Sequence, residues 1–248
     1  MKLTLAEPRY LKESINVISE LVTEAKFKIN SNGLELVAMD PANVAMVIFK
    51  LLSSCFVEYN VEKSLELGIN LNSFKQILKR AKSEDTLTLE FGDDNKLTLI
   101  LKSRTTRKFS IPVLELEDRE QKVPDLAFPV IVESYANVLV EAIDDIGIVS
   151  ESISFITEPE KLTIKGEGNM SKAQVEIVQD DDTKITSDGP DPVRSKYSIE
   201  YLKKMVGGSK ISDRVTILMD KDYPMKLDFK EVDKVQLSFI LAPRVEDD

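Results

Sequence analysis

The chain has 248 residues, of which 42% are hydrophobic and 31% charged, and its formal net charge is −10. This composition is typical of a globular protein and excludes a disordered chain. There is no histidine and only one cysteine, so an internal disulfide, a cysteine-rich zinc site and a histidine general base are all excluded.

The first half reads as alternating strands and helices. Leu11, Ile15 and Ile18 recur at helical spacing, and Asn32-Gly33 is a strong tight-turn signal between two strands. Asn72 can cap a second helix that runs through Ala81. The predicted elements are strand 1–5, helix 8–22, strands 26–29, 34–39 and 44–51, helix 72–81, and strands 87–91, 96–101 and 109–114.

Residues 116–129 are acidic, contain two prolines and lack a sustained hydrophobic period, which predicts a linker. It separates an N-terminal domain, 1–115, from a C-terminal domain, 130–248. The predicted elements of the second domain are strand 130–132, helix 134–148, strands 152–157, 161–166 and 172–178, helix 199–206, and strands 214–219, 225–230 and 234–241.

The two halves repeat at a constant offset of 128 residues. The repeat covers apolar positions and some polar ones. Examples are Leu11/Leu139, Ile15/Ile143, Phe27/Phe155, Phe74/Leu202, Leu99/Leu227, Lys75/Lys203 and Asp85/Asp213. A repeat of this length predicts two copies of one α+β domain that pack with pseudo-symmetry, as in a ring or an arc.

No signal peptide or membrane-spanning apolar run is recognisable, so we expect an intracellular, soluble, cytoplasmic protein without a membrane partner. Cys55 lies among apolar residues and is expected to be a small buried hydrophobe rather than a reactive thiol. None of the common nucleotide, zinc-protease or hydrolase motifs occurs. We therefore expect no enzymatic activity, no cofactor and no metal.

Charge is unevenly distributed along the chain. Residues 75–82 hold four cations and no acid, whereas 115–120 is strongly acidic and the chain ends in Glu246, Asp247 and Asp248. In a helix, Lys75, Lys79 and Lys82 form one stripe on a different face from the apolar residues. Because Lys203 and Lys210 repeat two of these positions, the stripe favours sequence-independent contacts with phosphates over a merely solvated face.

Three segments carry a family resemblance: residues 34–47, residues 68–87 and the terminal Leu241-Ala-Pro-Arg-Val-Glu. Together they resemble proliferating cell nuclear antigen (PCNA), the sliding clamp of archaea and eukaryotes, with the archaeal type favoured. The similarity extends over essentially the whole chain, including the linker.

The resemblance implies two clamp domains per chain and a trimeric ring, with helices lining a hole around double-stranded DNA and antiparallel sheets outside. Such a clamp is a non-catalytic processivity factor at the nucleoid, or in the nucleus if the source is eukaryotic. Its implied partners are a clamp loader, DNA polymerase, flap endonuclease, DNA ligase and other motif-bearing proteins. Their motif, Gln-x-x-aliphatic-x-x-aromatic-aromatic, enters a pocket beneath the linker.

Three sets of residues follow from the charge pattern and the resemblance. The predicted DNA-facing residues are Lys12, Lys75, Lys79, Lys82, Lys203 and Lys210. The implied partner-peptide pocket comprises Met39, Val44, Met46, Val123, Pro224, Ile240, Leu241, Ala242, Pro243 and Arg244. The implied subunit interface comprises Arg80, Lys82, Arg107, Phe109, Ile111, Glu141, Asp145, Lys172, Val175 and Ile177.

At the interface, the resemblance implies pairing between the edge strands 104–111 and 172–179 of neighbouring chains. The helix 134–148 has an acidic polar face, which predicts ion pairs between Glu141 or Asp145 and cations of the next chain. Two alternatives stay open: a peptide-binding scaffold or assembly protein of the same fold that does not encircle DNA, and a hydrolase based on paired acids such as Asp144-Asp145.

Overall fold

The computed structural model describes residues 1–117 and 121–244; residues 118–120 and 245–248 lie outside this description. The chain divides into two compact units. The first unit comprises Met1–Pro41, Val47–Val123 and Glu231–Leu237, and the second comprises Ala42–Met46, Pro124–Lys230 and Ser238–Asp248.

The elements of the first half alternate as expected from the sequence. They are β1 (Lys2–Leu5), α1 (Arg9–Ile18), β2 (Glu24–Asn30), β3 (Gly33–Met39), β4 (Ala45–Leu52), the short 3₁₀ helix η1 (Ser53–Cys55), β5 (Glu58–Asn60), β6 (Leu65–Asn70), α2 (Leu71–Leu78), β7 (Thr86–Phe91), β8 (Lys96–Lys102) and β9 (Thr106–Pro112). One antiparallel sheet has the order β5-β1-β7-β8-β9, and β4-β3-β2-β6 are neighbours in another.

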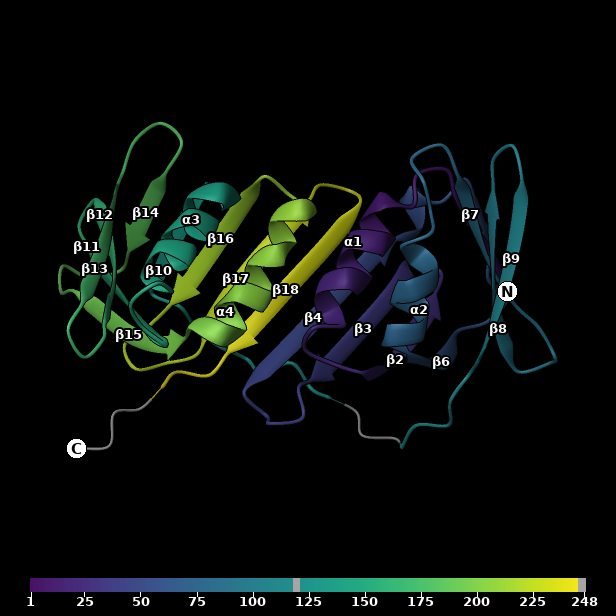
Figure 1. The fold of residues 1–248 in the computed structure, drawn as a ribbon, viewed down its shortest axis with the longest axis horizontal. Helices are drawn as coiled ribbons and strands as arrows, with labels where there is room; N and C mark the ends of the chain where they lie inside the picture. The colour runs from purple at the N-terminus through teal and green to yellow at the C-terminus, as the bar shows by residue number, and fades with distance from the viewer. Residues whose placement is uncertain (118–120, 245–248) are drawn as a thin grey trace. The chain divides into compact units, whose positions relative to one another are not determined.

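The elements of the second half are β10 (Val130–Tyr135), α3 (Ala136–Ile146), β11 (Ser152–Glu158), β12 (Lys161–Glu167), β13 (Lys172–Val178), β14 (Lys184–Ser187), β15 (Val193–Ser198), α4 (Ile199–Met205), the 3₁₀ helix η2 (Val206–Lys210), β16 (Arg214–Met219), β17 (Met225–Glu231) and β18 (Val235–Leu241). A four-stranded antiparallel sheet has the order β13-β12-β11-β15, and β14-β10-β16-β17-β18 are neighbours in another. Figure 1 shows each unit with its own pair of helices lying across strands.

The repeat predicted from the sequence is present in the fold. β2, β3, β6 and β7 coincide with β11, β12, β15 and β16 after a shift of 128 residues. The apolar residues at repeated positions are buried in both copies; Leu11 and Leu139, for example, are 0% and 2% exposed. The α+β fold class, with mainly antiparallel strands, is confirmed.

The second helix begins one residue earlier than its sequence predicts. Asn70, not Asn72, is the N-cap, and its side chain accepts a hydrogen bond from the Ser73 backbone N–H at 2.9 Å. The helix ends at Leu78; residues 79–80 of the predicted helix form a turn, and residue 81 belongs to neither a helix nor a strand. Phe74 still faces the core, where its ring meets Phe27 edge-on at 6.1 Å.

Some elements were absent from the sequence prediction. The strands β5, β14 and β15 lie in polar segments without a clear two-residue alternation, whereas β6 was missed although Leu65, Leu67 and Ile69 alternate along it. Cys55 is also less buried than expected, since its thiol is half-exposed and donates to the Lys234 carbonyl at 3.2 Å. Partial burial nevertheless raises its pKa, which is consistent with an unreactive thiol. Within the described residues, no helix is both long and apolar enough to cross a membrane.

Candidate functional site

The predicted DNA-facing lysines of the first unit fall into two groups. Lys12 donates to the Ala81 carbonyl at 2.9 Å, and Lys75 forms an ion pair with Glu20 and is only 15% exposed. These two ammonium groups therefore already have protein partners. Lys79 and Lys82 are exposed at the end of α2 and remain the more available cations.

In the second unit, Lys203 and Lys210 are also exposed. The Lys203 ammonium lies beside Gly147 at the C-terminus of α3, where a Cβ added to Gly147 would be 2.7 Å from Nζ. A cation at a helix C-terminus interacts favourably with the helix dipole. Lys203 thus connects α4 with the C-terminus of α3, and the residue is still exposed to solvent.

Part of the predicted peptide pocket is a groove in the first unit. Met39 lines a cavity of about 690 Å³ formed by β2, β3 and residues of the linker. Leu116 and Gln121 contribute the linker side of this groove, and neither was selected from the sequence. Val123, which was selected, is 47% exposed and does not line it.

The start of the linker is fixed to β6 by a short bridge. The Leu114 backbone N–H donates to the Gly68 carbonyl at 2.8 Å, and a Cβ at Gly68 would lie 2.2 Å from the Leu114 oxygen. Only glycine permits this approach of the two backbones. The bridge holds the chain so that Leu116 lines the groove. It joins two residues, Gly68 and Leu114, that are far apart in the sequence.

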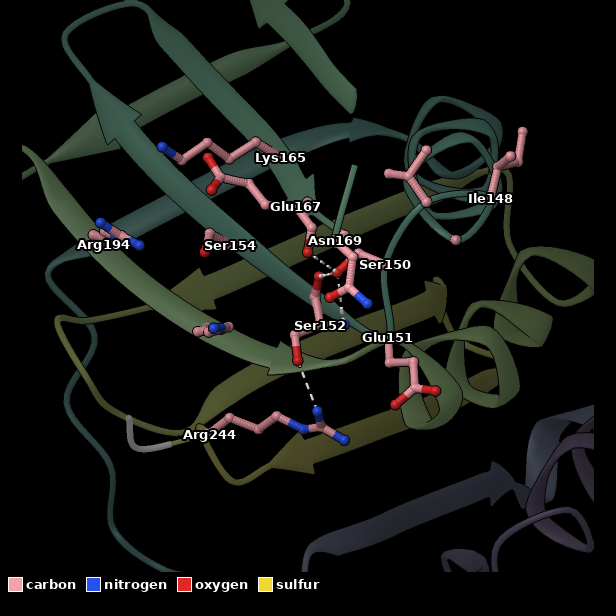
Figure 2. Close-up of a pocket in the computed structure, with 15 residues that line it drawn as sticks. Ile148, Ser150, Glu151, Ser152, Ser154, Lys165, Glu167, Asn169, Arg194 and Arg244 are labelled. Atoms are coloured by element: carbon pink, nitrogen blue, oxygen red, sulfur yellow. Dashed lines mark hydrogen bonds between the residues drawn. The ribbon is translucent and has the colours of Figure 1, made fainter. Parts of the chain in front are cut away.

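The other predicted pocket residues belong to the second unit. The Ala242 backbone N–H donates to the Val44 carbonyl at 2.9 Å. Met46, Ile240 and Leu241 are buried, so they support the local packing more than they line a surface. The more accessible residues are Pro224, Ala242, Pro243 and Arg244. Figure 2 shows Arg244 pointing to Ser152, whose hydroxyl accepts its hydrogen bond at 2.7 Å.

The two strands expected at the subunit interface are the terminal strands of their sheets. β9 pairs with β8, and β13 pairs with β12. On both strands the buried or half-buried apolar residues alternate with exposed polar ones. The former are Phe109 and Ile111 on β9 and Val175 and Ile177 on β13. Lys172, at the start of β13, pairs with Glu167 at 3.4 Å.

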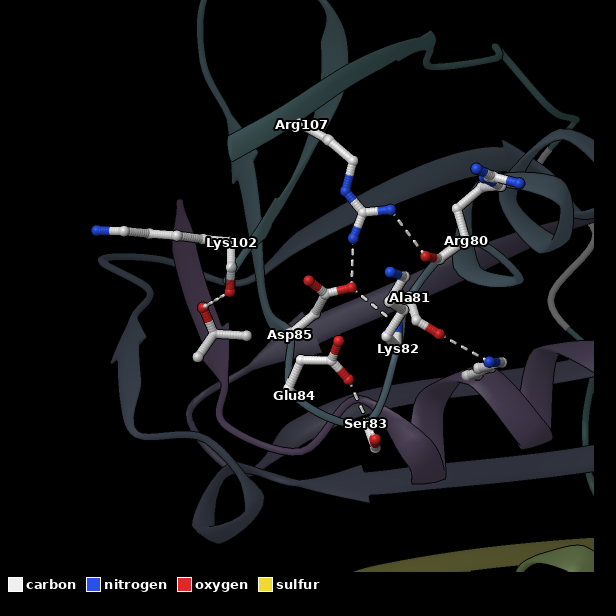
Figure 3. Close-up of polar contacts among 10 residues, drawn as sticks. Arg80, Ala81, Lys82, Ser83, Glu84, Asp85, Lys102 and Arg107 are labelled. Carbon is white, nitrogen blue, oxygen red and sulfur yellow. Dashed lines mark hydrogen bonds and ion pairs between the residues drawn. The ribbon is translucent and has the colours of Figure 1, made fainter. Parts of the chain in front are cut away.

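Arg107, a predicted interface residue, is held by contacts within its own chain (Figure 3). It donates to the Arg80 carbonyl at 3.0 Å and to the fully buried Asp85 carboxylate. The Lys82 backbone N–H also donates to Asp85, at 2.8 Å. This backbone hydrogen bond and the guanidinium lower the pKa of Asp85 to about 2. The repeat had marked Asp85 as a recurring position without indicating this role.

The remaining predicted charges of the interface are solvent-exposed. Arg80 and Lys82 lie on the turns after α2, and Glu141 and Asp145 lie on α3. The exposed members of this set are therefore cationic in the first unit and acidic in the second.

Comparison with known proteins identifies the family of this chain. The family model for the N-terminal domain of proliferating cell nuclear antigen matches residues 1–123, and the model for its C-terminal domain matches residues 122–244. The chain belongs to the PCNA family. The family resemblance found in the sequence is confirmed.

Individual PCNA relatives match almost end to end. A DNA polymerase sliding clamp of Thermococcus gammatolerans is 37% identical over 94% of each chain. One of Nanoarchaeum equitans is 34% identical over 98% of this chain and 99% of its own. The crystal structure of PCNA from Thermococcus kodakaraensis matches with a TM-score of 0.92 and 29% identity, covering 98% of this chain and 99% of that one.

Proposed function

We propose that this chain is a DNA sliding clamp, a non-catalytic processivity factor that encircles double-stranded DNA as a trimer and tethers polymerase and other enzymes to it. The observation that carries the proposal is membership of the PCNA family over both domains, with relatives named as DNA polymerase sliding clamps. The archaeal relatives favour a place at the nucleoid in the cytoplasm. Segment 116–129 acts as the connection between the two domains.

The proposed DNA contacts are made by lysines. Lys79, Lys82, Lys203 and Lys210 are exposed and contact phosphates directly or through water. Lys12 and Lys75 have partners within the chain, so they contribute to the electrostatic field more than to direct contacts. Because the contacts are to phosphates, binding is independent of base sequence and weakens with salt.

The proposed partner site takes the aliphatic and aromatic side chains of a Gln-x-x-aliphatic-x-x-aromatic-aromatic motif. Met39 supplies an adaptable apolar wall in the groove of the first unit. In the second unit, Pro224, Ala242 and Pro243 are the accessible residues of the set that the resemblance implies. The clamp loader, flap endonuclease and DNA ligase would use this site in turn with the polymerase.

The ring closes through the two terminal strands. Pairing β9 of one chain with β13 of the next removes both exposed sheet edges, which would otherwise template aggregation. Exposed Arg80 and Lys82 face Glu141 and Asp145 across this joint, and Arg107 retains its pairing with Asp85.

The experiment that tests the function is retention on closed DNA. A clamp loaded on nicked circular DNA should stay bound in high salt and slide off after the circle is linearised, because the link is topological. Light scattering should give the mass of three 27.9 kDa chains. A monomer or dimer, or equal loss from circular and linear DNA, would instead favour the scaffold that does not encircle DNA.

A further inference from the structure

A polar pocket lies in the second unit on the solvent-facing side of the sheet β13-β12-β11-β15. Ile153, Phe155 and Ile164 on these strands are 0% exposed and form the core side. Side chains alternate across a strand, so Ser154 and Lys165 face the opposite way. The pocket has a volume of about 760 Å³ and also includes the turn after α3 and Arg244.

The pocket gathers cations from separate segments of the chain. Ser154 is paired in register with Lys165 on one neighbouring strand and with Lys196 on the other. Arg194 lies two residues before Lys196 on the same strand, and Arg244 reaches the pocket from the C-terminal segment. Figure 2 shows the labelled cationic side chains distributed around Ser152 and Ser154.

Two of these cations, Lys165 and Arg194, have no acidic partner among the described residues. Glu151 and Glu167 are the acids that line the pocket, and Glu167 pairs with Lys172, which lies outside it, at 3.4 Å. In a chain of net charge −10, four cations around one cavity are a local reversal of sign.

A serine among the cations adds a hydrogen-bonding group to the pocket. Ser154 lines the cavity, and the residue is only 6% exposed. Ser154 is in register with Lys165, so an acceptor oxygen placed there would receive a hydrogen bond from the hydroxyl and a charge-assisted contact from Lys165.

The lining favours carboxylates over nucleic acid. No aromatic side chain occurs among the lining residues, so unstacked bases have no platform. The cavity is too small for a duplex, and Glu151 and Glu167 would repel a continuous phosphate backbone. Discrete carboxylates on a flexible peptide can reach the cations individually.

We propose that this pocket binds an acidic segment of a partner protein, with carboxylates at Lys165 and Arg194 and a hydrogen bond from Ser154. The proposal concerns a second contact point for partners, separate from the apolar motif pocket. It does not depend on whether the chain encircles DNA.

The test is fluorescence anisotropy of a labelled hexaglutamate peptide titrated with the full-length protein in low salt. We expect saturable binding that weakens strongly at about 0.5 M salt, where the Debye length is only a few ångströms. The double variant Lys165→Gln/Arg194→Gln should lose about tenfold in affinity. The variant Ser154→Ala should lose several-fold, without a change in net charge.

The matched control is Lys184→Gln/Lys221→Gln, which removes two exposed cations of the same unit outside the pocket. It should bind the peptide like the wild type. Equal losses in both double variants would overturn the proposal, because the peptide would then sense only net charge. Tighter, pocket-dependent binding of labelled oligothymidine would overturn it in favour of nucleic acid, and displacement by low-millimolar phosphate would overturn it in favour of a small-anion site.

Discussion

The Arg107 guanidinium donates a hydrogen bond to the Asp85 carboxylate, which is fully buried behind the turns that follow α2. The ion pair ties β9, a terminal strand of its sheet, to the segment that carries Arg80 and Lys82. The shape of this proposed ring joint is therefore set within a single chain before any neighbour is present.

Asp85 should make the free energy of unfolding depend on pH in the acid range. Its pKa falls from 3.8 to about 2 in the folded chain, so its stabilisation is complete above about pH 4 and is lost as pH falls toward 2. Urea unfolding of the wild type and Asp85→Asn should differ most at neutral pH, and the difference should shrink between pH 4 and 2. Asp213→Asn, at the exposed repeat position, is the control; a constant difference for Asp85→Asn at every pH would contradict the assignment.

Charge reversal on α3 should open the proposed ring. Glu141→Lys/Asp145→Lys places cations opposite Arg80 and Lys82, and we expect light scattering to show dissociation at low-micromolar concentration and low salt. Exposed ion pairs contribute only about 0–1 kcal/mol each, but repulsion acts at three joints. Asp188→Lys/Asp191→Lys makes the same charge change on an exposed loop and should remain a trimer. If the α3 variant stays trimeric, these carboxylates do not hold the joint.

The exposed lysines after α2 should matter for DNA and not for assembly. Lys79→Glu/Lys82→Glu should reduce clamp-stimulated synthesis and leave the mass of the assembly unchanged. Replacing each lysine by alanine removes one phosphate interaction and should lower the salt dependence of DNA binding by about one unit. The reversal Lys50→Glu/Lys63→Glu, at exposed positions elsewhere in the first half, should have little effect. Unchanged processivity in the first variant would refute the proposed role of these lysines.

Met39 is the most direct test of the motif pocket. Met39→Glu places a carboxylate in the groove formed by β2, β3 and the linker, where it must be desolvated when an apolar peptide side chain enters. Titration calorimetry with a motif peptide should show micromolar or tighter binding to the wild type and at least a tenfold loss in the variant. Val57→Glu, at a 69% exposed position, should bind normally. Leu241 is unsuitable for this test, since it is 1% exposed and a carboxylate there would unfold its surroundings.

Gly208 is a packing requirement of the second unit. A Cβ at this position would lie 2.3 Å from the ring of Phe229, which is fully buried. We expect Gly208→Ala to lower the unfolding free energy by about 1–3 kcal/mol, the usual cost of overpacking. Gly189→Ala meets no atom within 4 Å and should change stability by less than about 0.5 kcal/mol. Equal denaturation midpoints for the two variants would contradict this, because they would show that the aromatic ring of Phe229 can move to make room for the added methyl group.

The repeat allowed most of the fold to be predicted, because many buried apolar positions of one domain recur in the other, and the two copies support the same assignment. Phe27 and Phe155, for instance, occupy matching strands and are both buried. Where the signal was polar, prediction failed: β15 was missed because Arg194, Ser195 and Lys196 give no apolar alternation. The cap at Asn70 was misplaced because Asn72 has the same side chain and lies only two residues away.

The sites were less predictable than the fold, since their partners are distant in sequence. The pairs Lys75–Glu20 and Arg107–Asp85 join residues on different elements, and only the tertiary structure brings them together. The linker side of the Met39 groove depends on the Leu114–Gly68 bridge for the same reason. The spacing of the lysines predicted a cationic stripe on a helix, but it could not show which of these lysines already have a partner within the chain.

The first unit includes a segment from near the C-terminus, and this affects how the chain can fold during synthesis on the ribosome. Residues 231–237 belong to this unit, where the Lys234 carbonyl accepts from the Leu52 backbone N–H at 2.9 Å and the Asp233 carbonyl accepts from Ser54 at 2.7 Å. Those hydrogen bonds cannot form until almost the whole polypeptide has left the exit tunnel. The N-terminal half must therefore wait, incomplete, through the translation of the second half, and a nascent chain truncated before residue 231 would lack a segment that its first unit requires.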